Sequence, residues 1–130
     1  MKLLNPSEWT PPVGYSNGIA ARGRLVFVAG QIGWNAKQEF ESDDFAAQTE
    51  QALQNTVAVL REAGADPAHI ARMTWYVLDC AEYRAATRQI GGIYKRIIGK
   101  HYPAMTLVQV AALLEPRARV EIETTAVIPD

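Results

Sequence analysis

Two carboxylates in the last apolar segment are the groups in this chain best suited to chemistry. In VEIETTAVI, which spans residues 120–128, Glu121 and Glu123 alternate with apolar or small residues, so both carboxylates lie on one face of a strand. A carboxylate inside a small apolar domain needs a partner, water or an open cleft. Either both carboxylates face solvent, or one lines a pocket at a subunit interface and acts as a general base or positions water. The pattern leaves both interpretations open.

Two uncharged segments offer further polar groups. Tyr15 follows a glycine and precedes Ser-Asn, which predicts a phenol on a loop. Such a tyrosine usually serves packing, but it is also suited to donate a hydrogen bond. Ala29, Gly30 and Gln31 end an apolar run, where exposed backbone could approach a ligand closely. A β-bulge is the simpler explanation of Gly30.

Common metal and nucleotide motifs are absent, because the chain contains no CxxC, HExxH, P-loop or GxGxxG. His69 and His101 have no second ligand nearby in the sequence, so we do not expect a metal site. His101 precedes Tyr-Pro and is better explained as a loop residue than as a base. Cys80 has an acidic neighbour and no basic one, which favours an inert buried thiol over a nucleophile.

Composition narrows the class of protein. The chain has 130 residues, which suits one domain over residues 1–130, and 13 basic against 14 acidic residues give a net charge of -1. Without a block of like charge, neither nucleic acid nor a membrane surface is expected as a partner. The lone cysteine, a start without a signal peptide and the lack of a spanning segment predict a cytoplasmic protein.

Apolar periodicity predicts the order ββαβαββ. Three prolines between residues 5 and 14 favour an extended arm. Gly23 can adopt the positive φ of a tight hairpin between the first two strands, and Ser42, Asp43 and Asp44 can cap the first helix. The expected strands are 17–22, 24–31, 72–79, 104–114 and 117–128, and the expected helices run from about 45 to 64 and from 82 to 98.

This order predicts an α+β fold, in which both helices pack on one face of a single mixed sheet. The opposite face then has no helix to cover it. Since an apolar sheet face left bare would promote aggregation, we expect the chain to associate through that face.

Several segments, in order and over nearly the whole chain, resemble the RidA (YjgF-like) family. The resemblance implies a chorismate-mutase-like fold, a homotrimer with a barrel core and helices outside, and ligand clefts between subunits. It also implies hydrolysis of enamines or imines, such as 2-aminoacrylate, to 2-keto acids and ammonia without metal or cofactor. The segments are GYS (14–16), LVFVAGQIG (25–33), QALQNTVAVLREAGA (51–65), MTWYVLD (73–79), YPA (102–104) and VEIETTAV (120–127).

The resemblance also implies roles for individual residues. The family's tyrosine falls on Tyr15, its strand glutamate on Glu121, and its Ser-Gly-Gln motif on residues 29–31. Water attack on C=N would then be the chemistry. Glu121 would hold or activate the water, Tyr15 would hydrogen-bond the substrate or the leaving nitrogen, and backbone near Gly30 and Ala104 would orient the imine.

Two departures from the family pattern concern the substrate. Met105 stands where active members carry an arginine that grips the substrate carboxylate, and a thioether offers neither charge nor donor. Losing that pair would cost roughly 1.5 to 3 kcal/mol of binding free energy, or about one to two decades of affinity. Ala29 removes the serine hydroxyl. The family's polar residue on the second helix has no clear counterpart, and Arg88 or Gln89 could reach the cleft instead.

Three functional hypotheses follow. The first is an enamine or imine hydrolase for a substrate larger and less polar near Met105, such as a 2-aminomuconate-type compound, anchored by Arg72, Arg88 or Arg119. The second is a non-catalytic trimeric module that binds a small molecule or carboxylate at subunit interfaces. The third, a ribonuclease, fits poorly with a net charge of -1 and no basic stripe interleaved with aromatics.

Overall fold

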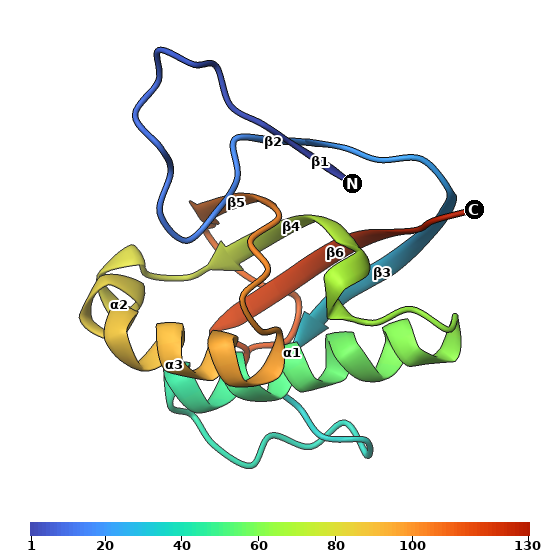
Figure 1. The fold of residues 1–130 in the computed structure, drawn as a ribbon. Coiled ribbons are helices and arrows are strands. Elements are labelled where there is room, and N and C mark those ends of the chain that lie inside the picture. The colour runs from blue at the N-terminus through green and yellow to red at the C-terminus, as the bar shows by residue number, and fades with distance from the viewer.

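A four-stranded mixed sheet forms the centre of the structure, a computed structural model that describes residues 1–130. The strand order is β3-β6-β4-β5, in which β5 is parallel to β4 and the other neighbours are antiparallel. A separate two-stranded sheet pairs β1 with β2 (Figure 1). The elements are β1 (Lys2–Leu4), β2 (Gly18–Ala20), β3 (Arg24–Ile32), α1 (Phe45–Glu62), the 3-10 turn η1 (Pro67–His69), β4 (Ile70–Val77), α2 (Cys80–Ala85), α3 (Thr87–Ile97), β5 (Ala104–Gln109) and β6 (Val120–Ile128).

The helices form a layer on one face of the sheet, as the sequence predicted, and the fold is the expected α+β type (Figure 1). Helix α1 begins after Asp44, whose carboxylate accepts a hydrogen bond from the Ala47 amide at 2.9 Å. The apolar side of α1 packs on the sheet and on α3, and Leu53 and Leu60 are fully buried there. The core therefore lies between the helices and one sheet face.

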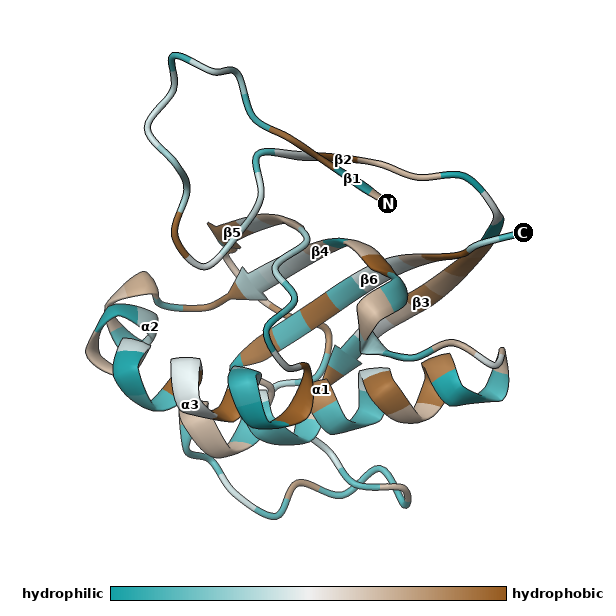
Figure 2. Cartoon of the chain, viewed as in Figure 1, coloured by the Kyte–Doolittle hydropathy of each residue, from teal (hydrophilic) through white to brown (hydrophobic).

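Strand β6 shows the predicted alternation (Figure 2). Val120, Ile122 and Ala126 are buried towards the helices, whereas Glu121 and Glu123 point to the other face. Strand β6 pairs with β3 on one side and with β4 on the other, so its side chains alternate between the two faces of the sheet. The prediction that both glutamates share a face is therefore confirmed.

The predicted hairpin around Gly23 is wrong. Strand β2 pairs with β1, whereas β3 pairs with β6, so the residues around Gly23 join two different sheets. Gly23 does have a positive φ of 146°, and a Cβ there would lie 2.0 Å from the carbonyl oxygen of Ile128. The glycine is thus required by the close approach of the end of β6, rather than by a hairpin turn.

The second helix and the last two strands are shorter than predicted. The helix breaks at Ala86, where φ is -101° and ψ is 8°, and the Thr87 hydroxyl donates to the carbonyls of Tyr83 and Arg84 across the break. Residues 110–119 form a loop instead of extending both strands. The buried Gln48 side chain holds this loop by donating to the Arg117 carbonyl and accepting from the Arg119 amide.

The sheet face opposite the helices has no helix over it, as predicted, but it is not uniformly apolar. We call it the open face. Its middle carries polar side chains, and the Tyr76 hydroxyl donates to Glu123 at 3.1 Å. Exposed apolar side chains lie on β3, where Leu25 is 56% and Phe27 is 74% exposed. No helix is both long and apolar enough to cross a bilayer.

Candidate functional site

Glu121 lies against a bulge in the neighbouring strand. The β3–β6 register shifts between Val28 and Gln31, which confirms the β-bulge predicted at Gly30. A Cβ on Gly30 would lie 2.0 Å from Glu121 Oε2, so only glycine leaves room for this carboxylate. The bulge and the close approach are therefore one feature, in which the missing side chain of Gly30 accommodates the carboxylate.

The Glu121 carboxylate opens into a cavity of about 390 Å³, here called the Glu121 cavity. Glu121 makes no hydrogen bond or ion pair, so its oxygens are free to accept from water or a ligand. Two apolar side chains, Trp34 and Leu114, share the lining, and Leu114 is 92% exposed. The complete lining is Gly30, Gln31, Ile32, Trp34, Gln38, Leu114, Glu115 and Glu121.

Tyr15 is held at the opposite edge of the sheet by its neighbour Ser16. The Ser16 amide donates to the Pro103 carbonyl at 3.0 Å, its hydroxyl donates to the Tyr102 carbonyl, and the residue forms a bridge with Ala104. These contacts fix the N-terminal arm beside the start of β5. Tyr15 itself is 41% exposed and its hydroxyl makes no hydrogen bond within the chain, so the phenol is available to a ligand.

A cavity of about 410 Å³, here called the Tyr15 cavity, lies between the arm and strands β4 and β5. Its charged group is Arg72, and its apolar groups include Ile19 and Met105. Ala104, whose backbone was expected near the substrate, also lines it. The complete lining is Tyr15, Ser16, Asn17, Gly18, Ile19, Ala71, Arg72, Ala104, Met105 and Thr106. A further cavity of about 600 Å³ lies on the arm side of Tyr15, with Lys100 as its charged group.

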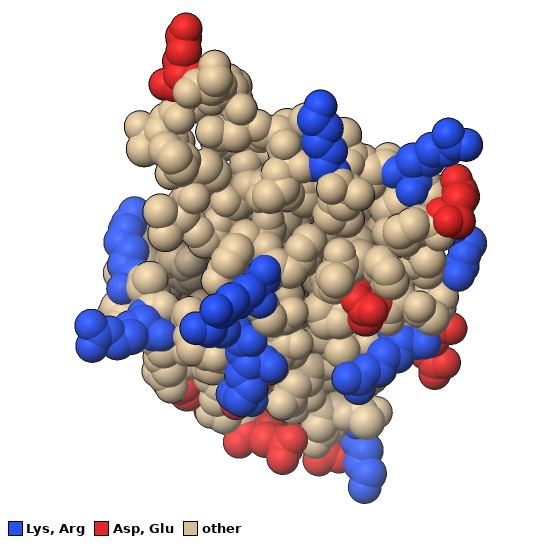
Figure 3. Space-filling view, viewed as in Figure 1, with Lys and Arg blue, Asp and Glu red and all other residues tan.

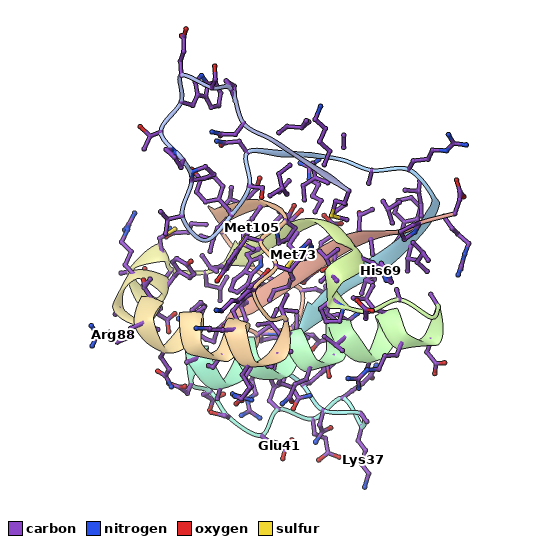
Figure 4. All side chains as sticks on the ribbon, in the orientation of Figure 1. Lys37, Glu41, His69, Met73, Arg88 and Met105 are labelled. Atoms are coloured by element: carbon purple, nitrogen blue, oxygen red, sulfur yellow. The ribbon has the colours of Figure 1, made fainter.

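Met105 packs as a core residue. It stands opposite Met73 in the β4–β5 register, and its side chain contacts the buried cluster beneath the sheet (Figure 4). Interpreted from packing alone, a methionine that fills the core at this position needs no further explanation. Met105 also lines the Tyr15 cavity, where it supplies no anion-binding group.

The other two arginines considered as anchors lie elsewhere. Arg119 donates to Glu82, and this hydrogen bond raises the pKa of the Arg119 guanidinium above its ordinary value. Arg88 is exposed on α3 and lies at the periphery in Figure 4, and neither it nor Gln89 lines the Tyr15 cavity or the Glu121 cavity. Within one chain, Arg72 is the arginine placed beside Tyr15.

One chain does not bring Tyr15 and Glu121 together. Glu121 stands opposite Tyr76, whereas Met105 stands opposite Met73 two strands away. The two sites are therefore separated by about 10 Å across the sheet and about 10 Å along it. Each residue lines its own cavity, so a site that uses both needs a second copy of the chain.

The comparisons with known proteins agree with this arrangement of elements. The family model described as Endoribonuclease L-PSP matches residues 7–128. The chain belongs to the RidA (YjgF-like) family. The RidA-family chain is 35% identical to Protein DfrA of Myxococcus xanthus, over 97% of this chain and 95% of that protein. It is 30% identical to the human 2-iminobutanoate/2-iminopropanoate deaminase, over 87% of this chain and 79% of the human protein.

Solved structures of RidA relatives share the fold. A Rid-family protein of unknown function from Yersinia pestis, YyfB, superposes with a TM-score of 0.84 at 38% identity, and the match covers 98% of each chain. E. coli TdcF, solved with bound serine, gives a TM-score of 0.69 at 28% identity and covers 98% of this chain and 99% of its own. The expected chorismate-mutase-like fold of the RidA-family chain is thus confirmed.

Sequence reasoning missed part of the lining. Trp34, Leu114 and Glu115 join the Glu121 cavity from two loops, residues 33–44 and 110–119. Nothing in their local pattern indicated that these loops meet at the bulge. Residues 110–114 and 117–119 of the second loop were predicted as strand, so Leu114 was expected in a strand, and Glu115 fell between the two predicted strands and was given no role.

Proposed function

We propose that this chain is an enamine or imine hydrolase that releases ammonia and a carbonyl product. The observation that carries the proposal is the unpaired Glu121 carboxylate, held over Gly30 and open to a cavity. Membership of the RidA family supports it, as do relatives that are named deaminases. Tyr15 and Glu121 remain our candidates for the catalytic residues.

The chemistry balances with water alone. Glu121 accepts a proton from water as the water oxygen bonds to the imine carbon, and the nitrogen takes up a proton to give a carbinolamine. The C–N bond then breaks as the hydroxyl gives up its proton to the nitrogen. Ammonia departs, and a C=O group remains on the product. An enamine first gains a proton on carbon to become the imine. A Tyr15 hydroxyl near the nitrogen would donate a hydrogen bond to the substrate or leaving group.

A homotrimer would bring the two cavities together. In this proposal the open face and its exposed Phe27 pack against neighbouring copies. The Tyr15 cavity of one copy then meets the Glu121 cavity of the next, so each cleft has contributions from two chains. Ala29, Gly30, Gln31 and Ala104 would orient the substrate through their backbone, and Arg88 could contribute only from a neighbouring subunit.

The lining favours a substrate with an apolar part. Trp34 and Leu114 border Glu121, and Ile19 shares a cavity with Tyr15, so the cleft offers apolar contacts to the carbon chain of a substrate. A conjugated enamine such as a 2-aminomuconate-type compound would suit this lining. This choice of substrate rests on the apolar groups named here.

The test follows ammonia release from 2-aminomuconate and from 2-aminoacrylate generated in place. The wild-type chain should accelerate at least one reaction, and Glu121→Gln should reduce the rate about 100-fold or more, since general-base catalysis contributes about 10²- to 10⁴-fold. Glu41→Gln is the matched control, because Glu41 is exposed and unpaired and lines neither cavity; Figure 4 shows it at the edge of the molecule below the helices. No acceleration with either substrate, or equal rates for Glu121→Gln and wild type, would overturn the proposal.

A non-catalytic binding module is the second candidate. It is favoured by Met105, which packs into the core, and by Ala29, which has no hydroxyl. Such a protein would bind carboxylates without accelerating imine hydrolysis, and Met105→Arg would create the activity. Robust activity of the wild-type chain would eliminate this candidate.

The charge distribution gives no support to an RNA substrate. Figure 3 shows basic and acidic side chains interspersed on the same face of the molecule. With a net charge of -1, the chain lacks the excess of positive charge that phosphate binding favours.

A further inference from the structure

Arg72 occupies a special position on the open face. It stands in register with Ala104 of β5 and with Thr125 of β6, near the start of β4. Its side chain is exposed and lines two cavities at once. One is the Tyr15 cavity, and the other is a polar cavity of about 420 Å³ in the middle of the open face. The guanidinium therefore lies between the substrate-side cavity and the polar centre of the sheet.

The guanidinium of Arg72 has no partner within the chain. None of the ion pairs or side-chain hydrogen bonds includes it. Glu123, which lines the polar cavity with Arg72, accepts its hydrogen bond from the Tyr76 hydroxyl. That bond raises the pKa of Tyr76, and Arg72 acts in the opposite direction, which places its charge within electrostatic reach of the pair. A planar cation with five free donors is well suited to bind a carboxylate in bidentate fashion.

We propose that Arg72 is the carboxylate-binding residue of the Tyr15 cavity. This inference rests on the proposed function for the identity of the ligand as a 2-imino or 2-enamino acid, or its 2-oxo acid product. The anion site then lies on β4, one strand spacing or about 4.8 Å from the strand that carries Met105. The position of Met105 is free to pack in the core because the cation is supplied from the next strand.

The same geometry sets the preferred ligand. The carboxylate binds at Arg72 on the open face, and the carbon chain lies towards Ile19, an apolar residue of this cavity. Tyr15 remains at the mouth with a free hydroxyl. We therefore assign the cavity to carboxylates that carry an apolar chain on the carbon next to the C=N or C=O group.

The experiment measures binding rather than turnover. Dissociation constants of 2-oxobutanoate and of its neutral analogue 2-oxobutanamide are determined by calorimetry for the wild-type chain, Arg72→Met, Arg72→Lys and Arg61→Met. Arg61 is the matched control, because it is an exposed and unpaired arginine on α1 that lines neither cavity. Thermal denaturation of each variant establishes that the fold is intact.

Arg72→Met should weaken binding of the carboxylate about 10- to 100-fold and leave binding of the amide nearly unchanged. Arg72→Lys should fall between wild type and Arg72→Met, since lysine keeps the charge and loses the bidentate geometry. Arg61→Met should match wild type. The inference is overturned if Arg72→Met binds 2-oxobutanoate as wild type does, if both ligands weaken equally, or if wild type binds neither.

The two proposals can fail separately. If wild type binds 2-oxobutanoate through Arg72 but releases no ammonia from any imine, the hydrolase proposal fails and the carboxylate site stands. If ammonia release persists in Arg72→Met with an unchanged KM for a carboxylate substrate, the carboxylate site fails and the hydrolase proposal stands.

Discussion

Substitution of Gly30 by alanine should displace the Glu121 carboxylate and lower activity, while the stability of the fold changes little. The added Cβ would lie 2.0 Å from Oε2, 2.7 Å from Cδ and 2.8 Å from Cγ of Glu121. Cβ atoms in proteins essentially never approach heavy atoms closer than 3.0 Å. The carboxylate must therefore move by about 1 Å or more, because the contacting atoms belong to a side chain that has open space beside it.

The magnitude follows from this displacement. A misplacement of about 1 Å in a reacting group can cost about 100-fold in rate, so kcat/KM of Gly30→Ala should fall by about two decades. The free energy of unfolding should change by less than about 1.5 kcal/mol, since the Glu121 side chain can rotate into its cavity without moving the backbone. Activity and stability should thus respond very differently.

The assay measures ammonia release at several concentrations of an imine generated in place, and urea denaturation measures stability. Gly91→Ala is the control, because a Cβ there meets nothing within 4 Å and the residue lies in the exposed part of α3. It should keep full activity and gain roughly 0.5 to 1 kcal/mol of stability, since alanine favours a helix over glycine. Near wild-type activity in a stable Gly30→Ala variant would refute the assigned position of the carboxylate, and so would global unfolding.

Three further predictions concern stability and assembly. Gly23→Ala should lower the free energy of unfolding by about 2 kcal/mol or more, because it combines a positive φ with a 2.0 Å contact to the backbone carbonyl of Ile128; an unchanged urea midpoint would contradict this. Burial raises the pKa of the Tyr94 phenol above its ordinary value of 10.0, so the native state holds the proton more tightly than the unfolded chain. Its contribution to stability is therefore fully present below pH 10 and is lost as the pH rises above it. Tyr94→Phe should reduce this alkaline loss in urea titrations, at the cost of the hydrogen bond to the His101 carbonyl at neutral pH; an alkaline loss as steep as that of wild type would show that another group titrates. Phe27→Asp should shift the sedimentation coefficient from that of the proposed homotrimer to that of a monomer, because it places a charge on the exposed apolar part of the open face; an unchanged sedimentation coefficient would show that the copies do not associate through β3.

Local patterns predicted the elements whose signals lie within a few residues. The cap at Asp44, the alternation in β6 and the bulge at Gly30 depend on short-range geometry, and the structure confirms all three. The hairpin at Gly23 failed for the opposite reason. Which strand pairs with β3 is a long-range choice, and the end of β6 at Ile128 takes the edge that a hairpin would have used.

The polar middle of the open face shows a similar limit. Strand β4 is dense in β-branched and aromatic residues, a composition that fits a strand at least half buried on both faces, yet Arg72 and Tyr76 lie on the open side. The alternation of side chains along a strand assigns residues to two faces of the sheet, but it does not show whether helices pack on one face or on both. That depends on the helices, which pack on one side only.

The sequence by itself determined the family and the α+β fold and offered two candidate catalytic residues, because motifs and periodicity are properties of neighbours along the chain. Tyr15, Glu121 and the methionine at position 105 were all visible in it. Only the tertiary structure decided that Tyr15 and Glu121 line separate cavities of one chain and that Met105 packs into the core. It also placed the unpaired Arg72 beside Tyr15, because strands distant in sequence become neighbours only when the sheet forms.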